Sequence, residues 1–585
     1  MQSKEVFVPV WGSVRLTPRE LRVIDHPAFQ RLREINQLGF VSTVFPGATH
    51  KRFEHAIGTL HAVTVMMDAV ERNRVVLGAQ NVRSNALEWL PDAPLSPSER
   101  ELTRLGALLH DIGHLAYGHT FEDELALLAP HDADERLNLV FGRTSWRGQD
   151  TESLRALVNR LYAKEAALAA PGREATEILL DIISKSRLNS PSTEIFRTAV
   201  CRDLIGNTLC ADLLDYLHRD WHHIGKTRAP DLRLLDYLEV RQSVSGRIGA
   251  PETSRLVLNL RTTERPRTDA VTSVLDLLES RYQLAEIALF HRTKLNATAM
   301  LERAVAEIAD ARLSEGPSYF STLVERILDC DDYEILDLLD EEAVEALKTG
   351  EIDDERRSRL EAARALLGSI RRRQLHKLAL SFYPKDSGQE SQMRRFSGDP
   401  DPATRSFSIP GGVAEDGGQA RLNLARALEE QFAFPPGSFA VYCPRRKMNA
   451  KVAQVQVLLD DSVKTLAEHE DGSKDGLTGG HLDAQRLRFQ RLWHMHVAVS
   501  PEALDTLIER GQESLLERTF DYLLGVYSEQ KAVDIAKSLI ATMPNLRESD
   551  QRVETPVFAG RNQPTLAADR RAFPNDRPLI VEYIR

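Results

Sequence analysis

Cysteines, long apolar runs and a basic leader are scarce or missing in this chain, and each absence excludes a class of protein. Only four cysteines occur in 585 residues (Cys201, Cys210, Cys330 and Cys443), with no metal-binding spacing and no dense disulfide framework. This usage is typical of a reduced compartment. No segment approaches the roughly 18 apolar residues of a membrane span, and Met1 to Trp11 shows no basic region followed by an apolar one. We therefore expect a cytoplasmic protein with no membrane partner.

An excess of positive charge is also missing. Lys and Arg number 75 against 86 Asp and Glu, so the formal net charge is −11, and the bulk field does not attract nucleic acid. Three local basic clusters stand against this background: Arg356, Arg357 and Arg359; Arg371, Arg372 and Arg373; and Arg445, Arg446 and Lys447. Solvated helix faces are the favoured interpretation, and anion sites for nucleotide or polynucleotide phosphates are the alternative.

Helix signals dominate the first 383 residues. The stretch Thr17-Pro18-Arg19-Glu20 predicts a capping box with proline at the first helical position, and Pro27 predicts a break after that helix. A second start signal, Ser96-Pro97-Ser98-Glu99, predicts a helix that ends near His110. Val6 to Leu16 is typical of a short strand or hairpin instead. We expect a rigid helical support for the residues at 110 and beyond.

The pattern changes after residue 383. Residues 384–420 are rich in Pro, Gly, Ser and charge, which indicates a loop or linker. Strands are predicted at Ser438 to Cys443, Lys451 to Leu459 and Leu492 to Val499, and a return to helix from Pro501 to Met543. The predicted architecture is mainly α: a helical domain over 1–383, a linker over 384–420 and a smaller α+β lobe over 421–585.

Four residues far apart in the sequence offer metal-binding side chains: His55, the adjacent pair His110-Asp111, and Asp212. An adjacent His-Asp pair is unusual, because one stretch of backbone must point both side chains at one ion. Imidazoles and carboxylates suit Mg and divalent first-row metals. Such an ion acidifies a bound water and polarises a phosphoryl group. We expect one divalent ion, with Mn, Mg, Fe and Zn equally compatible, and metal-dependent hydrolysis of a phosphate ester.

Further polar residues accompany these candidate ligands. Arg52 lies three residues before His55, so on a helix both share a face and Arg52 could reach phosphates held by the ion. One face of the helix after Asp212 is also polar, and it comprises Asp212, Asp215, Tyr216, Arg219 and Asp220. A salt-bridge ladder around Arg219 is the structural alternative, and it is compatible with a metal-binding role of Asp212.

The segment after Asp111 holds more imidazoles. His114 and His119 follow His110 by four and nine residues, and Glu122 lies three residues after His119. A carboxylate beside an imidazole raises its pKa and fixes its tautomer, which a general acid needs when an alkoxide leaves. His131, next to Asp132, is a candidate phosphate contact or a plain surface residue.

Together these motifs resemble the HD-domain deoxynucleoside triphosphate triphosphohydrolases, which include bacterial dGTPases and the human enzyme that joins a sterile-alpha-motif domain to an HD domain. The resemblance extends to an N-terminal signature, to Asp215-Tyr216 with Arg219-Asp220, and to Arg281-Tyr282 followed by His291. The signature comprises residues 24–33 (IDHPAFQRLR), 37–39 (QLG) and 45–50 (FPGATH). The resemblance as a whole covers most of residues 5–300 and, weakly, Tyr442-Cys443 and Lys447 to Val457.

The resemblance implies a helical HD core and a role for each matching residue. His55, His110, Asp111 and Asp212 would bind the metal, His119 with Glu122 would be the catalytic pair, and His114 and His131 would line the phosphates. Arg52 and Arg281 would bind the phosphates, with a second Mg on them, and Gln37, Leu38, Tyr216 and Asp220 would surround the deoxyribose. Asp25, Gln30 and Arg33 resemble residues that hold an activating nucleotide. A homo-oligomer is expected, because relatives are multimers.

Two departures weaken this assignment. Leu213 stands where the human enzyme has a phosphate-binding Lys, and Leu289 stands where relatives usually have a Tyr that stacks on the sugar. In addition, Val8-Pro9-Val10-Trp11-Gly12 lacks the Asp that usually precedes this proline. The preferred hypothesis is hydrolysis of a dNTP to a deoxynucleoside and inorganic triphosphate. A nuclease or phosphodiesterase acting on single-stranded nucleic acid or a modified nucleotide is the alternative, and a non-catalytic nucleotide sensor is the third.

Overall fold

The chain folds into two units, each with its own sheet. The computed structural model describes residues 3–84, 95–124, 130–187, 198–243, 253–261, 266–312, 316–348, 352–384, 417–444, 455–459, 462–468, 477–478, 480–510, 565–567 and 579–584. The first unit comprises Met1–Gly118, Pro130–Leu289 and Ala450–Arg488, and the second comprises His119–Ala129, Phe290–Asn449 and Phe489–Arg585. The predicted division at residues 383 and 421 stays a prediction. No helix in the described ranges is long and apolar enough to cross a membrane.

The first unit begins as its turn and cap signals predict. Strands β1 (Lys4–Val8) and β2 (Gly12–Leu16) form an antiparallel hairpin. Helix α1 (Pro18–Ile24) starts at a capping box, in which the Thr17 side chain accepts from the Glu20 amide and Glu20 accepts from the Thr17 amide. After α1 ends, Pro27 opens the short helix α2 (Pro27–Gln30). The predicted hairpin, cap and break are confirmed.

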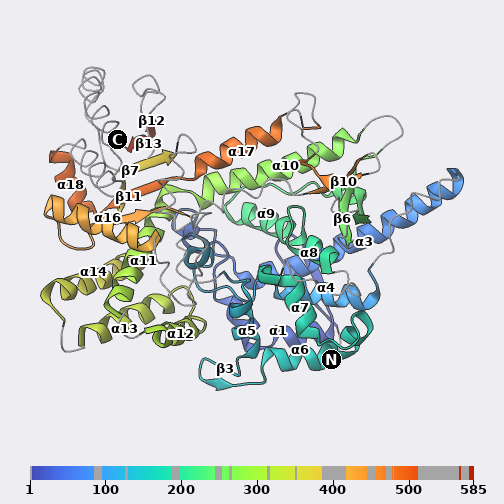
Figure 1. Ribbon diagram of the computed structural model, residues 1–585, viewed down its shortest axis with the longest axis horizontal. Coiled ribbons are helices and arrows are strands. Elements are labelled where there is room, and N and C mark those ends of the chain that lie inside the picture. Colours follow the sequence, from blue (N-terminus) through green and yellow to red (C-terminus); the bar gives the residue numbers. More distant parts are fainter. Residues whose placement is uncertain are drawn as a thin grey trace, which may run out of the picture. The chain divides into compact units, whose positions relative to one another are not determined.

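Three helices of the first unit carry the candidate site, and the longest of them packs against the other two (Figure 1). They are α3 (Arg52–Ser84), α4 (Pro97–Leu109) and α9 (Ala211–His223), and α3 contacts both of the others. Helix α4 starts at a capping box between Ser96 and Glu99 and ends at His110, as predicted. Gly58 lets α3 approach α9, because a Cβ atom there would lie 1.8 Å from Oδ1 of Asp215.

The remaining helices of the first unit surround this trio, and short 3-10 and π segments connect them. The helices are α5 (Asp134–Gly142), α6 (Leu154–Ala169), α7 (Ala175–Ile183), α8 (Thr198–Gly206), α10 (Thr268–Leu284) and α17 (His481–Leu492). The 3-10 segments are η1 (Arg31–Arg33), η2 (Gly39–Thr43), η5 (Lys185–Arg187) and η6 (Leu232–Tyr237), and η7 (Ala285–Leu289) is a π-helix. A two-stranded hairpin joins β3 (Ser145–Trp146) to β4 (Gln149–Asp150).

A four-stranded sheet in the first unit was not predicted from the sequence. Strands β5 (Leu238–Ser243) and β6 (Thr253–Asn259) pair antiparallel, β6 pairs parallel with β9 (Gln456–Leu459), and β9 pairs antiparallel with β10 (Ser462–Thr465). Leu256, Val257 and Leu258 are all buried, which fits a strand covered on both faces. The strand predicted at Lys451 to Leu459 is confirmed for β9, and 451–454 lie outside the described residues.

The second unit combines helices with a five-stranded antiparallel sheet in the order β12-β13-β7-β11-β8. Its strands are β7 (Lys377–Pro384), β8 (Phe439–Tyr442), β11 (Met495–Val499), β12 (Thr565–Ala567) and β13 (Leu579–Ile584). Its helices are α11 (Arg292–Arg312), α12 (Gly316–Ile327), α13 (Glu334–Lys348), α14 (Asp354–Arg371), α16 (Gly417–Phe432) and α18 (Pro501–Arg510), and a π-helical segment η4 spans Thr120–Glu124. An apolar core joins the sheet to α16 and α18 (Figure 1).

Several predictions for this part of the chain are settled. Strands β8 and β11 confirm those expected at Ser438 to Cys443 and Leu492 to Val499. Strand β7 was not predicted either, and it lies at the end of a segment in which helix signals dominate. The helix expected from Pro501 is confirmed through Arg510, whereas residues 511–543 lie outside the described part of the chain, as do residues 385–416 of the expected linker and the cluster from Arg445 to Lys447. The mainly α fold class is confirmed.

Replacement of the α4 cap tests how firmly this helix is anchored. Ser96→Ala should destabilise the start of α4 by about 1 kcal/mol, because the Ser96 hydroxyl accepts from the Glu99 amide. Hydrogen exchange at the Glu99 amide should accelerate accordingly. Ser98→Ala, two residues after Ser96, is the matched control and should leave that exchange rate nearly unchanged. Equal exchange in both variants would show that the cap does not anchor α4.

Candidate metal centre

Three helices bring the four predicted ligands together. His55 lies on the first turns of α3, His110 and Asp111 end α4, and Asp212 lies on the first turn of α9. The Nε2 atom of His55 is 3.2 Å from Oδ1 of Asp212 and 3.6 Å from Oδ2 of Asp111. The Nε2 atom of His110 is 3.3 Å from Oδ1 of Asp111 and 3.7 Å from Oδ1 of Asp212. Each imidazole therefore faces both carboxylates, and the ligand atoms of His55, His110 and Asp111 lie close enough together to share one ion.

A hydrogen-bond acceptor at Nδ1 orients the imidazoles of both His55 and His110. The Nδ1 atom of His55 lies 2.7 Å from Oδ2 of Asp215, and the Nδ1 atom of His110 lies 2.8 Å from the carbonyl oxygen of Ala107. An acceptor at Nδ1 places the proton there and leaves the lone pair on Nε2. Both Nε2 atoms are buried and have no hydrogen-bond partner among the described residues. Two such atoms facing two carboxylates fit a divalent cation.

The electrostatics of the centre also favour a cation. Burial raises the pKa of Asp111, but the imidazoles of His110 and His114 and the guanidinium of Arg52 outweigh it and hold that pKa well below its usual range. Burial likewise opposes the charged form of His55, but the carboxylates of Asp212 and Asp215 prevail and raise its pKa to about 10. The carboxylates are thus ionised and attract positive charge, which an ion would supply in place of protons.

Asp215 is the support behind His55. Its two oxygens accept Arg219 Nε at 2.9 Å and Nη2 at 2.8 Å, in addition to His55. The Trp11 indole N–H donates to Oδ1 at 2.6 Å. Burial raises the pKa of Asp215, but Arg219 and His55 outweigh it and lower that pKa to about 2. The expected ion pair of Arg219 is therefore present, and it coexists with the convergence of the ligands.

Arg52 contacts the centre through a carboxylate. Its Nη1 donates to Oδ2 of Asp111 at 2.7 Å, and its Nη2 donates to the carbonyl oxygen of Gln37 at 3.4 Å. Gly118 has a φ of 52°, and a Cβ atom there would lie 2.3 Å from Nη2 of Arg52. The backbone at Gly118 therefore closes over the guanidinium. Leu38, next to Gln37, is half-buried at the start of η2.

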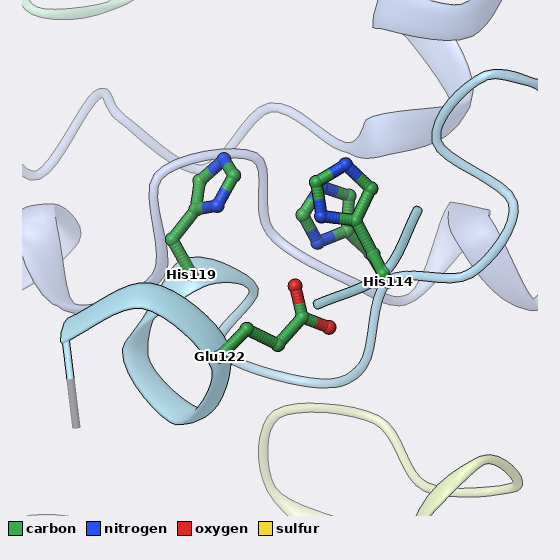
Figure 2. A group of neighbouring side chains, drawn as sticks. His114, His119 and Glu122 are labelled. Carbon is green, nitrogen blue, oxygen red and sulfur yellow. The ribbon is translucent and has the colours of Figure 1, made fainter. Parts of the chain in front are cut away.

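A second group of side chains lies beside Asp111. The rings of His114 and His131 stack at 3.6 Å, and their Nε2 atoms are 3.4 Å and 3.9 Å from Oδ1 of Asp111. Ligand-type atoms of His114, His119, Glu122 and His131 all lie within 4.8 Å of one another. Figure 2 shows the carboxylate of Glu122 pointing toward the imidazoles of His114 and His119. His114 and His131 belong to the first unit and His119 and Glu122 to the second, so a shared catalytic site of these four residues stays a prediction.

The residues expected around the sugar differ in their burial and in their contacts. Asp220 is buried, and its Oδ1 lies 2.8 Å from Nε2 of His50, a residue for which no role was predicted. Tyr216 is half-buried on α9, where burial raises its pKa despite the opposing charge of Arg281 in the last turn of α10. Of the two departures, Leu213 is buried in the first unit and Leu289 is half-buried at the end of η7.

The three residues expected to hold an activating nucleotide lie near the end of α1. Asp25 caps that helix and is exposed. Gln30 donates to the carbonyl oxygen of Ile24 at 2.7 Å and accepts from Nε of Arg33 at 2.9 Å. The Arg33 guanidinium lies 3.5 Å from the centre of the Phe53 ring. Nucleotide binding by these residues stays a prediction.

Comparisons with known proteins agree with this geometry. A family model for the HD domain matches residues 52–220. The uncharacterized protein YwfO of Bacillus subtilis is 27% identical over 314 residues, which are 53% of this chain and 58% of that protein. The deoxynucleoside triphosphate triphosphohydrolase SAMHD1 homolog of Dictyostelium discoideum is 23% identical over 387 residues, which are 64% of this chain and 60% of that protein. The chain thus spans less than two thirds of these relatives.

A solved structure shares the fold. The crystal structure of a hypothetical protein from Aquifex aeolicus has a TM-score of 0.51 and 19% identity, and the match covers 88% of this chain and 100% of that one. The matched HD model begins at Arg52 and ends at Asp220, so it contains all four converging ligands. The chain therefore carries an HD domain over residues 52–220, and it is similar to the deoxynucleoside triphosphate triphosphohydrolase SAMHD1 homolog over about two thirds of its own length.

Proposed function

We propose that this protein hydrolyses a deoxynucleoside triphosphate to a deoxynucleoside and inorganic triphosphate. The observation that carries the proposal is the pair of buried, unpartnered Nε2 atoms of His55 and His110, which face the carboxylates of Asp111 and Asp212 beside a second imidazole cluster. The resemblance to proteins of this class supports the choice of substrate.

The metal ligands and the imidazole cluster would divide the chemistry. A divalent ion held by His55, His110, Asp111 and Asp212 would acidify a water molecule and polarise a phosphoryl oxygen. In the reaction, the water oxygen forms a bond to the α-phosphorus while the bond from that phosphorus to O5′ breaks. His119 donates a proton to O5′, and Glu122 orients the imidazole. The proton lost by the water passes to solvent, and triphosphate leaves.

Substrate binding would use the residues on either side of this centre. Arg52, already held by Asp111, would present its remaining N–H groups to the phosphates together with Arg281, and His114 and His131 would line them. A second Mg on the phosphates would reduce their mutual repulsion. Gln37, Leu38, Tyr216 and Asp220 would enclose the sugar and leave no room for a 2′-hydroxyl. Asp25, Gln30 and Arg33 keep their proposed role as an activator site, and a homo-oligomer remains part of the proposal.

The polynucleotide alternative has less support from the basic clusters. Arg371 forms a two-pronged ion pair with Asp337, and Arg359 pairs with Glu355. A guanidinium already paired with a carboxylate contributes less to a phosphate-binding surface. The non-catalytic sensor would leave the arrangement of His119 and Glu122 beside the ligands without a purpose.

Removal of a metal ligand should separate metal binding from folding. His110→Ala or Asp111→Ala should abolish activity and the bound metal ion while the circular dichroism spectrum stays close to that of the wild type. His222→Ala, on the same helix as Asp212 but without a ligand position, is the control and should retain the ion. Full activity of a metal-stripped double variant would contradict the assignment.

Replacement of the proposed acid should slow the reaction without loss of the ion. His119→Ala should lower the rate by about 10² to 10⁴, the usual contribution of a general acid. Glu122→Gln should cost less, because the imidazole itself remains. Metal content, measured by atomic absorption, should equal that of the wild type in both variants. Loss of the ion in His119→Ala would make His119 a ligand instead.

Product analysis should distinguish nucleotide from polynucleotide hydrolysis. With each dNTP, each NTP and labelled single-stranded DNA as substrates, inorganic triphosphate should form from a dNTP, and the rate should fall little with moderate salt, because few counterions are released. Replacing Arg371, Arg372 and Arg373 together by Ala should leave this rate unchanged. Mononucleotides released from DNA, with no triphosphate from any dNTP, would overturn the proposal.

A further inference from the structure

The turn between β1 and β2 has an unusual backbone. Val8 pairs with Gly12 in the hairpin, so Pro9, Val10 and Trp11 form the connection. Val10 has a φ of 69°, in the left-handed region that β-branched residues rarely adopt. Such a conformation costs free energy and persists only where surrounding contacts hold it. In this turn, the next residue, Trp11, makes contacts that can hold the backbone in place.

Trp11 inserts between α3 and α9. The centre of its ring lies 5.1 Å from that of His61 on α3 and 6.0 Å from that of His218 on α9. Its indole N–H donates to Oδ1 of Asp215 at 2.6 Å, across 204 positions of sequence. The hairpin is therefore tied to the carboxylate that supports His55.

The indole completes the coordination of the Asp215 carboxylate. A carboxylate offers about four lone-pair sites. On Oδ2 the donors are His55 Nδ1 and Arg219 Nε, and on Oδ1 they are Arg219 Nη2 and Trp11 Nε1. Without the indole N–H, the buried Oδ1 atom would keep Arg219 as its single donor in the described structure. The carboxylate could then rotate, and the Nδ1 atom of His55 would lose a fixed acceptor.

We infer that Trp11 is a positioning residue for the metal ligand His55, and that it acts through Asp215. The indole N–H fixes the carboxylate, the carboxylate fixes the tautomer and ring plane of His55, and Nε2 stays aimed at the ion. The inference rests on the metal centre of the proposed function but does not depend on which phosphate ester is the substrate. No residue spacing reveals it, because Trp11 and Asp215 meet only in the folded chain.

Two substitutions separate the N–H group from the bulk of the ring. Trp11→Phe keeps an aromatic ring between His61 and His218 but removes the donor. Trp11→His keeps the donor, because Nε2 of histidine occupies the same place in its five-membered ring as Nε1 of tryptophan, but removes the fused benzene ring. Trp221→Phe is the matched control. Trp221 lies on α9, as Asp215 does, but its indole donates to Ser280 at 2.9 Å and not to Asp215.

The measurements are the dissociation constant for Mn²⁺, by competition with a chelator, and the melting temperature of the metal-free full-length chain. Outer-shell partners typically contribute 10- to 100-fold to metal affinity, so Trp11→Phe should weaken Mn²⁺ binding by about tenfold. Trp11→His should bind Mn²⁺ more tightly than Trp11→Phe even if it melts earlier. Trp221→Phe should lower the melting temperature and leave the dissociation constant within about twofold of the wild-type value.

Three outcomes would overturn the inference. These are a Trp11→Phe variant that binds Mn²⁺ as tightly as the wild type, a Trp11→His variant that binds no better than Trp11→Phe, and a Trp221→Phe variant with an equal loss of affinity. A failure of the proposed substrate would look different, because Mn²⁺ would still bind to the wild-type chain while no triphosphate formed from any dNTP.

Discussion

The buried carboxylate of Asp215 is the contact on which the arrangement of the candidate metal ligands depends. It joins three parts of the chain that are far apart in sequence, because it accepts hydrogen bonds from Trp11, His55 and Arg219. A buried carboxylate is costly unless its oxygens are filled by donors, and here each oxygen has two. The same contact requires α3 to come close to α9, and Gly58 supplies the space. The Asp215 side chain therefore contributes both to the packing of α3 against α9 and to the orientation of the His55 imidazole.

The centre follows from this support. With Asp215 behind His55 and the Ala107 carbonyl behind His110, both imidazoles present a lone pair to the same side. The carboxylates of Asp111 and Asp212 close that side, and Arg52 holds Asp111 from the direction of Gln37. The Nδ1 atoms of His55 and His110 are hydrogen-bonded outside the centre. Their Nε2 atoms, on the inner side, are therefore available to bind an ion. This division of roles is typical of metal sites whose outer contacts orient the ligands.

Local signals in the sequence predicted the parts of the fold that depend on local chemistry. The capping boxes at Thr17 and Ser96 and the break at Pro27 concern neighbouring residues, and the structure confirms them. Strands β5, β6 and β7 escaped prediction, because their stability comes from pairing with distant strands such as β9 and β11. Single-sequence patterns carry little information about such partners.

The candidate site shows the same division. His110 and Asp111 stand out because they are adjacent, and the resemblance assigned partners to them. The roles of Trp11 and His50 were missed, because an indole or a lone imidazole is most often a core or surface residue and nothing in the spacing links them to Asp215 or Asp220. The Arg219 ion pair could be expected from its four-residue spacing to Asp215, but its connection to His55 could not.

Anomalous X-ray diffraction from crystals of the Mn²⁺-loaded protein tests the central claim most directly. The account predicts one strong anomalous peak about 2.0 to 2.3 Å from the Nε2 atoms of His55 and His110 and from carboxylate oxygens of Asp111 and Asp212. Asp215 should remain outside the coordination sphere, on the Nδ1 side of His55. A peak ligated by other residues, or a fully loaded protein without a peak at this point, would contradict the account.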